Sequence, residues 1–431
     1  MSKVNILCPY CFEPFVREAV RVQCVNIAEV QKVSEDGTIK KSPVCPSEED
    51  EKYNNHWGSR VKIKYVYPAN LTRKERGGLF SKPKEIQAKP CPRCGILSQR
   101  FVCPHCHNWL PTEMIEKGSD IISVVGGPAS GKSNYIVALI HQLRKYQARL
   151  GLSVTLQQVG RNESEMTTNL FKEAEKTIFK QKEALRKTQV TKNPIPWIIR
   201  LESRITGKAV YLVFYDTAGE VFKNIEKMRD ALYYQHSKAV IVAFDTLAIP
   251  KIKKVLEKKN IDINDEAYDY KEMWDTIQNF SQQHRDYKLT SRPYAFVFTK
   301  FDTVIDNYED LDFRIEGSSF IDDEGDFKNS SYIKDGVVKM DELKDCSSII
   351  ADALRDPEIW DEESFVTNIE KEWGDNGMFF GVSALGGMTD GVGNIQTKKN
   401  EDGEEVVKPI RVLDPLIWIL WKLGGFGINI K

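Results

Sequence analysis

The sequence predicts an α/β fold, a doubly wound and mainly parallel sheet preceded by a small β-rich module. Short apolar runs alternate with helical patterns between residues 121 and 301, which is the order of parallel strands joined by helices. Eight of the nine cysteines lie before residue 107, so a separate module precedes the sheet. With 431 residues, the chain is long enough for two or three domains.

Apolar runs mark the expected strands. Runs at 210–215 and 239–244 are almost wholly apolar, as buried strands are. The run at 153–159 alternates only weakly between apolar and polar residues. Strands are expected at 121–125, 153–159, 197–201, 210–215, 239–244, 294–298 and 378–382.

Helical spacing marks the expected helices. Within 134–146, Ile136, Leu139, Ile140 and Leu143 follow i, i+3, i+4, i+7 spacing. The two prolines in 193–196 end a long charged helix. Helices are expected at 134–146, 163–187, 221–235, 265–283, 340–354 and 362–373, and a closing helix has Asp414 as its N-cap, Pro415 at the first helical position and Gly424 at its end.

Composition changes suggest the domain boundaries. We expect a cysteine-rich module over 1–112 and the sheet domain over 118–431. Acidic residues gather after residue 302 without the spacing of a calcium loop. We therefore expect a solvated acidic insertion at about 303–375 and a charged linker at 397–405.

The overall composition disfavours two classes of protein. A net charge of −1 gives no bulk attraction to nucleic acid. No run approaches the roughly 20 apolar residues of a membrane span, and the first residues lack the apolar core of a signal peptide. We expect a cytoplasmic protein.

The most informative motif follows the first strand and reads Gly126-Gly127-Pro128-Ala129-Ser130-Gly131-Lys132-Ser133. It fits G-x-x-x-x-G-K-[ST] between a strand and a helix, where backbone N–H groups surround phosphates. We expect Lys132 to reach the β and γ phosphates, Ser133 to ligate Mg²⁺ and Asn134 to line the same site. The flanking pattern disfavours the alternative, a glycine-rich turn with a chance Gly-Lys-Ser.

A second motif, Asp216-Thr217-Ala218-Gly219, follows the strand at 210–215. An aspartate at a strand end can hold Mg²⁺ through water, and a glycine three residues later can bring a backbone N–H to the γ-phosphate. Alone, the pattern is often a plain turn. We expect Asp216 and Gly219 to complete the phosphate site.

A third motif indicates which base is bound. Thr299-Lys300-Phe301-Asp302 fits [NT]-K-x-D, so the Lys300 stem can cover a purine while Asp302 accepts from guanine N1–H and its exocyclic amine. Adenine offers no such pair of donors. A backbone N–H of Ser383-Ala384-Leu385 can meet guanine O6.

The front module carries the spacing of metal ligands. Cys91, Cys94, Cys103 and Cys106 form two Cys-x-x-Cys knuckles near zinc-ribbon spacing, and Cys8 with Cys11 forms a third whose simplest partners are Cys24 and Cys45. Knuckles exchanged between sites, or His56, His105 or His107 as a ligand, stay open. We expect two structural Zn²⁺ ions. The basic residues between 62 and 89 are interpreted as a solvated face, with nucleic-acid contact the disfavoured alternative.

Together the four nucleotide motifs resemble the translation-factor and Ras-like class of P-loop GTPases, from Asp120 to about Leu423. With the cysteine knuckles, the chain looks most like bacterial double-GTPase-type domains, which are associated with conflict or defence systems. The resemblance implies that Gly126, Gly131, Lys132 and Ser133 hold phosphates and Mg²⁺. It also implies γ-phosphate sensing by Asp216 and Gly219, and guanine selection by Lys300 and Asp302.

Two positions depart from that class. No signature identifies the threonine that reaches Mg²⁺ in the triphosphate state; Thr188 is favoured, Thr191 is the nearest alternative, and Thr167 and Thr168 are less favoured. Glu220 stands where many relatives have glutamine. A carboxylate repels the γ-phosphate and cannot donate as an amide does. Slow hydrolysis is expected, or Glu220 is an ordinary acid at a helix start.

These features favour a GTP-binding switch with slow Mg²⁺-dependent GTP hydrolysis to GDP. Its zinc module would relay the nucleotide state to a protein partner or activating protein. The alternative is a zinc-dependent scaffold that binds GTP or GDP without significant turnover. An ATPase acting on nucleic acid is disfavoured by Lys300, Asp302 and the neutral charge.

Overall fold

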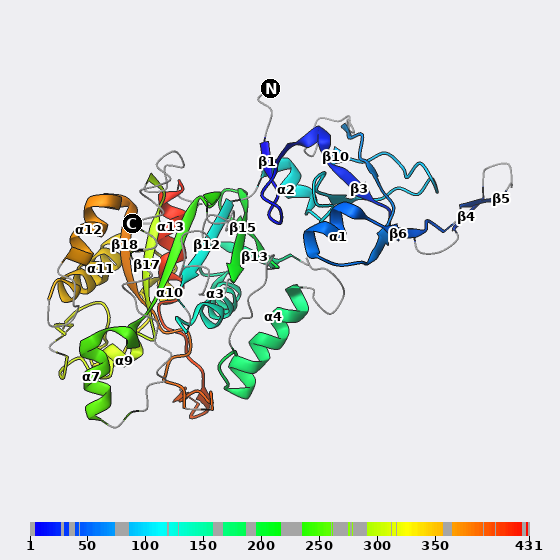
Figure 1. Ribbon diagram of the computed structural model, residues 1–431. Helices are drawn as coiled ribbons and strands as arrows, with labels where there is room; N and C mark the ends of the chain where they lie inside the picture. The colour runs from blue at the N-terminus through cyan, green and yellow to red at the C-terminus, as the bar shows by residue number, and fades with distance from the viewer. Residues whose placement is uncertain are drawn as a thin grey trace. The chain divides into compact units, whose positions relative to one another are not determined.

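The structure is a computed structural model (Figure 1). It describes residues 5–26, 30–33, 39–42, 44–73, 86–118, 120–127, 129–157, 167–186, 195–216, 235–259, 261, 275, 278, 291–311, 313–315, 317–356, 364–390, 392–400, 402–424 and 428–429. The chain divides into two compact units, Met1–Ser119 and Asp120–Lys431. Each unit is described by itself.

The front unit is built from short antiparallel strands. At its centre β3 (Arg21–Gln23) pairs with β11 (Arg100–Val102) on one side and with β8 (Val66–Pro68) on the other. The other strands form two-stranded pairs: β1 (Asn5–Leu7) with β2 (Pro14–Val16), β4 (Val30–Val33) with β5 (Ile39–Ser42), β6 (Ser47–Glu49) with β7 (Lys62–Lys64), and β9 (Thr72–Arg73) with β10 (Ile86–Gln87).

Two α-helices and a short 3-10 helix, Arg17–Ala19, complete the described part of the front unit. α1 (Glu51–Trp57) is capped by Asp50, whose side chain accepts from the Tyr53 N–H, and it ends at Gly58 with φ +62°. α2 (Thr112–Lys117) follows the last strand. Strands of only two to four residues bury little apolar area, so a unit of this kind needs further cross-links.

The second unit contains a seven-stranded mixed sheet in the order β13-β14-β15-β12-β16-β17-β18. The strands are β12 (Asp120–Gly126), β13 (Leu152–Leu156), β14 (Trp197–Ser203), β15 (Ala209–Asp216), β16 (Ala239–Asp245), β17 (Tyr294–Thr299) and β18 (Gly377–Gly381). The five strands from β15 to β18 run parallel, whereas β13 and β14 add an antiparallel edge. The expected mainly parallel α/β sheet is thus confirmed.

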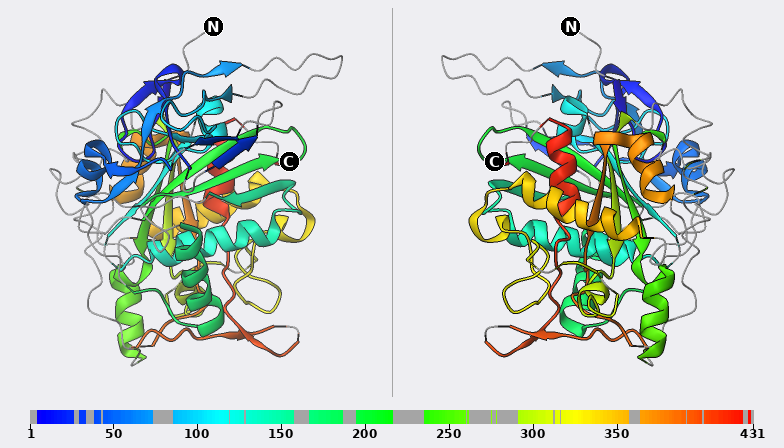
Figure 2. Two further views of the ribbon diagram at one scale, coloured as in Figure 1. Left: turned by 90° about the vertical axis from the view of Figure 1, so that its right-hand side faces the viewer. Right: turned by 90° about the vertical axis from the view of Figure 1, so that its left-hand side faces the viewer.

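Helices pack on both faces of this sheet (Figures 1 and 2). α3 (Lys132–Tyr146) and α13 (Asp414–Lys422) share one buried cluster with the inward residues of β12 and β17. On the opposite face, the Trp373 ring of α12 (Ser364–Trp373) packs at a tilt against Tyr294 and edge-on against Phe296. The central strands are buried on both sides, which explains their continuous apolar runs.

The remaining described helices border the sheet: α4 (Thr167–Lys176), α7 (Pro250–Lys258), α9 (Asp302–Ile305), α10 (Tyr332–Asp335) and α11 (Met340–Leu354). None of the described helices combines the length and apolar character that crossing a bilayer requires.

Several expected elements need correction. The helix predicted at 163–187 is α4 followed by a π-helical turn, Thr177–Gln181, and it ends because Lys182 adopts a left-handed φ of +61°. The charged stretch predicted as a linker contains a hairpin, β19 (Lys398–Lys399) with β20 (Glu405–Val406). α7 was not predicted at all. The helices predicted at 221–235 and 265–283 lie outside the described residues, except for 235, 275 and 278.

Asp414 is not the N-cap of the closing helix. Leu413 takes that position, and Asp414 is the first helical residue. Its buried carboxylate instead accepts from Arg411 Nε at 2.9 Å and from the Ser330 hydroxyl at 2.8 Å. A buried carboxylate is stabilised more by a guanidinium than by a backbone N–H, so the ion pair determines where this side chain points.

Candidate nucleotide and metal sites

The loop of the first motif joins β12 to α3, at the carboxyl end of the central strands. Gly126 pairs with Ala243 of β16, and a Cβ at Gly126 would lie 2.3 Å from the Ala243 carbonyl oxygen. Ala129 and Gly131 adopt left-handed φ values of +60° and +72°. The loop therefore turns tightly over the edge of the sheet, as a phosphate-binding loop requires. Pro128 lies outside the described residues.

The Lys132 side chain folds into this loop. It is 7% exposed, and its ammonium donates to the carbonyls of Gly126 at 2.9 Å and Gly127 at 2.7 Å. The Ser130 hydroxyl lies 3.3 Å away and itself donates to the Gly127 carbonyl. The backbone carbonyls of the loop thus hold the Lys132 ammonium in a fixed position. An anion bound in the loop would contact an ammonium that is already oriented.

The next residues begin α3. Ser133 is the second helical residue, so it lies in the first turn of α3, next to the phosphate loop. Asn134 follows, and its side-chain oxygen accepts from the Leu185 N–H at 3.0 Å. This bond ties the first turn of α3 to the segment that leads to Thr188. Neither Thr188 nor Thr191 lies within the described residues.

The second motif begins at the end of β15. Asp216 is the last residue of that strand and pairs in register with Val124, two residues before Gly126. Gly219 and Glu220 lie outside the described residues. Of the less favoured threonines, Thr167 donates its hydroxyl to the Gln157 carbonyl at 2.7 Å and so acts at the start of α4.

The third motif is attached directly to the phosphate loop. Thr299 ends β17, and its hydroxyl lies 3.0 Å from both the Ser130 and the Phe244 carbonyl oxygens. Lys300 follows with a left-handed φ of +56°, which turns the chain sharply at the strand end. Because Ser130 belongs to the loop, the two motifs share one rigid edge.

Asp302 is buried without a full set of partners. It is 2% exposed, and among the described residues its Oδ2 has no hydrogen-bond donor. Burial raises the pKa of this carboxyl, a hydrogen bond from Ser383 lowers it in part, and the charge of Asp306 raises it further. An orphaned buried acceptor is costly. A buried carboxylate oxygen without a donor is expected where a bound ligand supplies the hydrogen-bond donors.

Ser383-Ala384-Leu385 lies beside this carboxylate. The Phe301 N–H donates to the Val382 carbonyl at 3.0 Å, so the third motif is bonded to the residue before Ser383. Ser383 and Ile410 exchange two backbone hydrogen bonds, and the Ser383 hydroxyl accepts from the Gly386 N–H at 2.8 Å. The structure therefore brings Thr299, Lys300, Asp302 and Ser383 to one edge.

Sequence reasoning missed Asp245. This residue ends β16, pairs in register with Thr299, and has its Oδ2 2.7 Å from the Lys300 ammonium. The signal was present, because Asp245 follows a buried apolar run in the same way that Asp216 follows its own. An aspartate at the end of a central parallel strand is a candidate site residue wherever it occurs.

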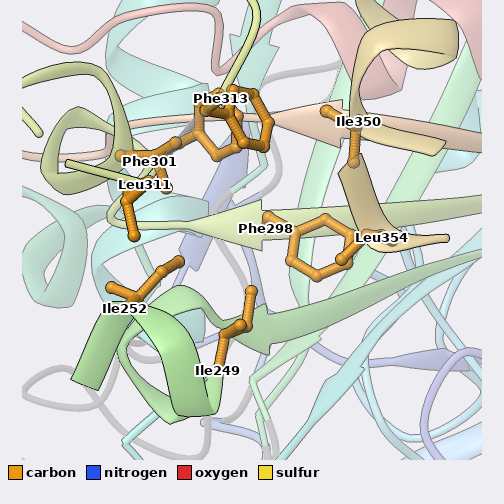
Figure 3. Close-up of a pocket in the computed structure, with 9 residues that line it drawn as sticks. Ile249, Ile252, Phe298, Phe301, Leu311, Phe313, Ile350 and Leu354 are labelled. Atoms are coloured by element: carbon orange, nitrogen blue, oxygen red, sulfur yellow. The ribbon is translucent and has the colours of Figure 1, made fainter. Parts of the chain in front are cut away.

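An apolar pocket lies behind the third motif (Figure 3). Its lining is wholly hydrophobic: Ile249, Ile252, Phe298, Phe301, Val304, Leu311, Phe313, Ile350 and Leu354. Among the described residues no polar side chain lines it, so this lining offers nothing to a phosphate or a base edge. Phe301 is the one residue that it shares with the nucleotide motifs.

The cysteines form two groups of four. One contains Cys8, Cys11, Cys103 and Cys106, and the other contains Cys24, Cys45, Cys91 and Cys94. Their Sγ atoms approach at 3.7 Å (Cys8–Cys106), 3.8 Å (Cys11–Cys103), 3.6 Å (Cys24–Cys94) and 4.0 Å (Cys45–Cys91). Sulfurs at the corners of a tetrahedral Zn²⁺ site with Zn–S bonds of about 2.3 Å are about 3.8 Å apart. Both groups fit zinc.

This arrangement corrects the expected pairing. The sequence pattern joined Cys91 and Cys94 with Cys103 and Cys106, and Cys8 and Cys11 with Cys24 and Cys45. The knuckles are exchanged because β3 and β11 run antiparallel, with Arg21 opposite Val102 and Gln23 opposite Arg100. Cys24 and Cys103 therefore lie at opposite ends of this strand pair. Cys24 groups with the Cys91 and Cys94 knuckle at its end, and Cys103 groups with the Cys8 and Cys11 knuckle at the other end.

Within the described residues, no histidine joins either cysteine group. His107 Nδ1 lies 2.7 Å from Asp50 Oδ2, so this ring is tied to the cap of α1. Burial lowers the pKa of His56 to about 4. Burial raises the pKa of the Cys8 and Cys24 thiols, and neighbouring cysteines add to the shift. A divalent cation removes this cost, because it stabilises the thiolates.

Comparisons with known proteins bear on the nucleotide site. A family model described as Double-GTPase 1 matches residues 123–239. A curated protein of Mycolicibacterium smegmatis (strain ATCC 700084 / mc(2)155), named "Putative ESX-1 scaffolding and assembly protein SaeC", is 28% identical over 161 residues, which cover 36% of this chain and 40% of that protein. The chain thus matches less than half the length of this relative.

A crystal structure of the protein ttk003000868 from Thermus thermophilus aligns with 62% of this chain and 37% of its own, at 15% identity and a TM-score of 0.23. A TM-score this low supports no inference. The family match stands on its own, and a domain of this family implies a guanine nucleotide with Mg²⁺. Residues 123–239 match a domain of the double-GTPase type, and the cysteine groups of the front unit fit a zinc module.

Proposed function

We propose that this protein is a GTP-binding switch that hydrolyses GTP slowly with Mg²⁺. The observation that carries the proposal is Asp302, a buried carboxylate with an orphaned oxygen, fixed to the phosphate loop through Thr299 and Ser130. Guanine N1–H and its exocyclic amine would supply the missing donors. Adenine presents an acceptor at N1 and would leave this carboxylate unpaired, at a cost of about 1–3 kcal/mol or more.

The phosphate groups would bind in the loop between β12 and α3. Lys132 would exchange its bonds to the Gly126 and Gly127 carbonyls for bonds to the β and γ phosphates. Ser133 and Asp216 would hold Mg²⁺, which supplies charge neutralisation at the phosphates. Gly127, Pro128, Ala129 and Ser130 would line the phosphates with backbone groups, and Ala384 and Leu385 would flank the base.

Hydrolysis is proposed to be slow. The residue after Gly219 is Glu220, and a carboxylate cannot both donate to and accept from an attacking water as an amide does. Thr188 is proposed as the switch threonine. Thr188 lies three residues after Leu185, whose N–H donates to Asn134 in the first turn of α3. A change at the phosphates would therefore reach the Thr188 segment through this one hydrogen bond.

The front unit is proposed to relay the nucleotide state to a protein partner or activating protein in the cytoplasm. Its cysteine groups would hold two Zn²⁺ ions as structural cross-links. The relative from Mycolicibacterium smegmatis is named as a scaffolding and assembly protein, which favours protein partners over nucleic acid. We propose a cysteine-rich module at 1–112, a GTPase domain at 118–431 with an acidic insertion at about 303–375, and a bacterial conflict or defence role.

Nucleotide competition tests the guanine assignment. Full-length protein is titrated with a fluorescent GDP analogue, and GTP, GDP and ATP are added as competitors. GTP and GDP should displace the probe, and ATP should not. The variant Asp302→Ala should lose this preference. Equal competition by ATP in the native protein would refute the proposal.

A second candidate is a zinc-dependent scaffold that binds guanine nucleotide without turnover. The same cysteine groups and the scaffolding relative favour it. Phosphate release separates the two, because turnover by the native protein should exceed that of Lys132→Ala. Equal rates, with candidate partners present, would favour the scaffold. Hydrogen exchange of the front unit with GDP and with a non-hydrolysable GTP analogue tests the relay.

A further inference from the structure

A second carboxylate lies at the edge of the proposed guanine site. Asp245 Oδ2 is 2.7 Å from the Lys300 ammonium, and the two side chains are 4% and 37% exposed. Removing the Lys300 ammonium from such a pair would leave an uncompensated buried charge. The pair therefore determines where the charged end of Lys300 lies.

The backbone holds Asp245 in place independently of Lys300. Its Oδ1 accepts from the Leu247 N–H at 3.1 Å, which caps the short helical turn after β16. The next residue, Thr246, donates its hydroxyl to the Thr299 carbonyl oxygen. The link between Asp245 and Lys300 thus adds to the bonds that Thr246 and Phe244 make with Thr299 at the ends of β16 and β17.

The alternative partner for Lys300 is Asp302, two residues further along the chain. Within the described residues, no lysine or arginine forms an ion pair with Asp302, and its Oδ2 has no donor. If the Lys300 ammonium paired with Asp302, it would occupy the oxygens that guanine needs. The structure avoids this because Asp245 binds the ammonium instead.

We propose that Asp245 is a positioning residue of the guanine site. By holding the Lys300 ammonium, it fixes the Lys300 stem as a platform for the base and leaves the Asp302 carboxylate to the guanine donors. This inference rests on the proposed guanine nucleotide function. It assigns Asp245 an effect on base selectivity that operates only through Lys300.

The test compares affinities for GDP and for inosine diphosphate, whose base lacks the exocyclic amine. The ratio of the GDP affinity to the inosine diphosphate affinity therefore reports whether the Asp302 carboxylate can accept from the exocyclic amine. Asp245→Asn keeps the side-chain shape and the acceptor for Leu247 but loses the charge. It should weaken GDP binding by about tenfold, the loss of one charge-assisted bond, and bring the ratio toward one. With Lys300→Met also present, Asp245→Asn should leave the ratio unchanged.

Lys300→Met alone gives an independent readout if Asp245→Asn does not fold. It retains most of the stem and has no ammonium, so the ratio should stay near that of the native protein. Glu370→Gln is the matched control, because it removes an exposed ion pair with Arg355 and should change neither affinity.

Two results would overturn the inference: Asp245→Asn with the native ratio, or a loss of equal size with and without Lys300→Met. A ratio near one in Lys300→Met alone would also overturn it. Native protein that binds GDP and ADP equally would instead remove the proposed function, so the two failures are distinguishable.

Discussion

The Phe301 ring lies directly over Gly381, the last residue of β18. A Cβ added at Gly381 would lie 2.5 Å from the Phe301 Cδ1 atom. Phe301 in turn contacts three rings from the segment after α9, with centroids 6.0 Å from Phe313, 5.1 Å from Phe320 and 6.0 Å from Phe327. The third nucleotide motif is therefore built around an aromatic cluster that leaves no room for a side chain at Gly381.

Gly381→Ala should displace Phe301 and with it the adjacent Lys300 and Asp302. We expect a loss of about 1–3 kcal/mol in the free energy of unfolding, the usual cost of overpacking a core, together with weaker GDP binding. Chemical denaturation and nucleotide titration measure the two effects. Phe301→Leu added to Gly381→Ala should recover part of both, because a smaller side chain makes room. A double variant no better than Gly381→Ala would contradict the packing argument.

Asp302→Asn should stabilise the nucleotide-free protein at neutral pH while weakening GDP binding. The buried charge is removed, so the free energy of unfolding should rise by about 1 kcal/mol or more. Guanine loses an acceptor, so affinity should fall at least tenfold. Denaturation without nucleotide and GDP titration provide the two measurements. An Asn variant less stable than the native protein would contradict the idea that this carboxylate is held at a cost.

The same carboxylate predicts two pH dependences of opposite sign. The pKa of Asp302 is raised in the folded protein, so the folded state retains the proton more strongly than the unfolded chain. Without nucleotide, the Asp302 contribution to stability should increase as the pH falls through the raised pKa. GDP binding needs the ionised carboxylate and should weaken over the same range. Both trends should vanish in Asp302→Asn, which serves as the reference at every pH.

Zinc stoichiometry distinguishes the observed cysteine grouping from the one that spacing suggested. Cys11→Ser and Cys24→Ser should each lower the zinc content from two ions per chain to one, and together they should abolish it. Cys11→Ser with Cys103→Ser should retain one ion. The pairing expected from spacing predicts the reverse for these double variants. Elemental analysis of purified protein gives the answer, and Cys346→Ser, outside both groups, is the control.

Lys132→Met should weaken GTP binding by about a hundredfold or more, since it removes a charged donor to the phosphates. Lys145→Met is the control, because Lys145 is an exposed residue at the other end of α3. It should bind like the native protein. Calorimetry measures both affinities. Equal weakening by the two variants would mean that net charge, and not the loop, governs binding.

The elements and site residues that could be predicted are those whose sequence patterns lie within a short stretch of the chain. Buried parallel strands carry continuous apolar runs, so β12, β15, β16 and β17 were expected within two residues of their ends. α11 coincides with its prediction at 340–354. Lys132 and Ser130 could be placed in the loop because their positions follow from the motif.

Long-range pairing was not predictable in the same way. Spacing along the chain favoured joining the two nearest knuckles, whereas the antiparallel register of β3 and β11 exchanges them. Asp414 was interpreted by its local context as a helix cap, but Arg411 and Ser330 bind its carboxylate. The position of Asp245 after an apolar run is a local signal, but its pairing with Lys300, 55 residues away, is not.

The cysteine groups are nested along the chain, and this suggests an order of assembly. Cys24, Cys45, Cys91 and Cys94 lie between the first knuckle and the last, which supply the other group. Closing the inner group first would shorten the loop that the outer group must close from roughly 90 residues to roughly 25, which lowers the entropic cost by about 1 kcal/mol. The inner ligands also leave the ribosome earlier than Cys103 and Cys106. Metal loading should therefore proceed from the inside outward.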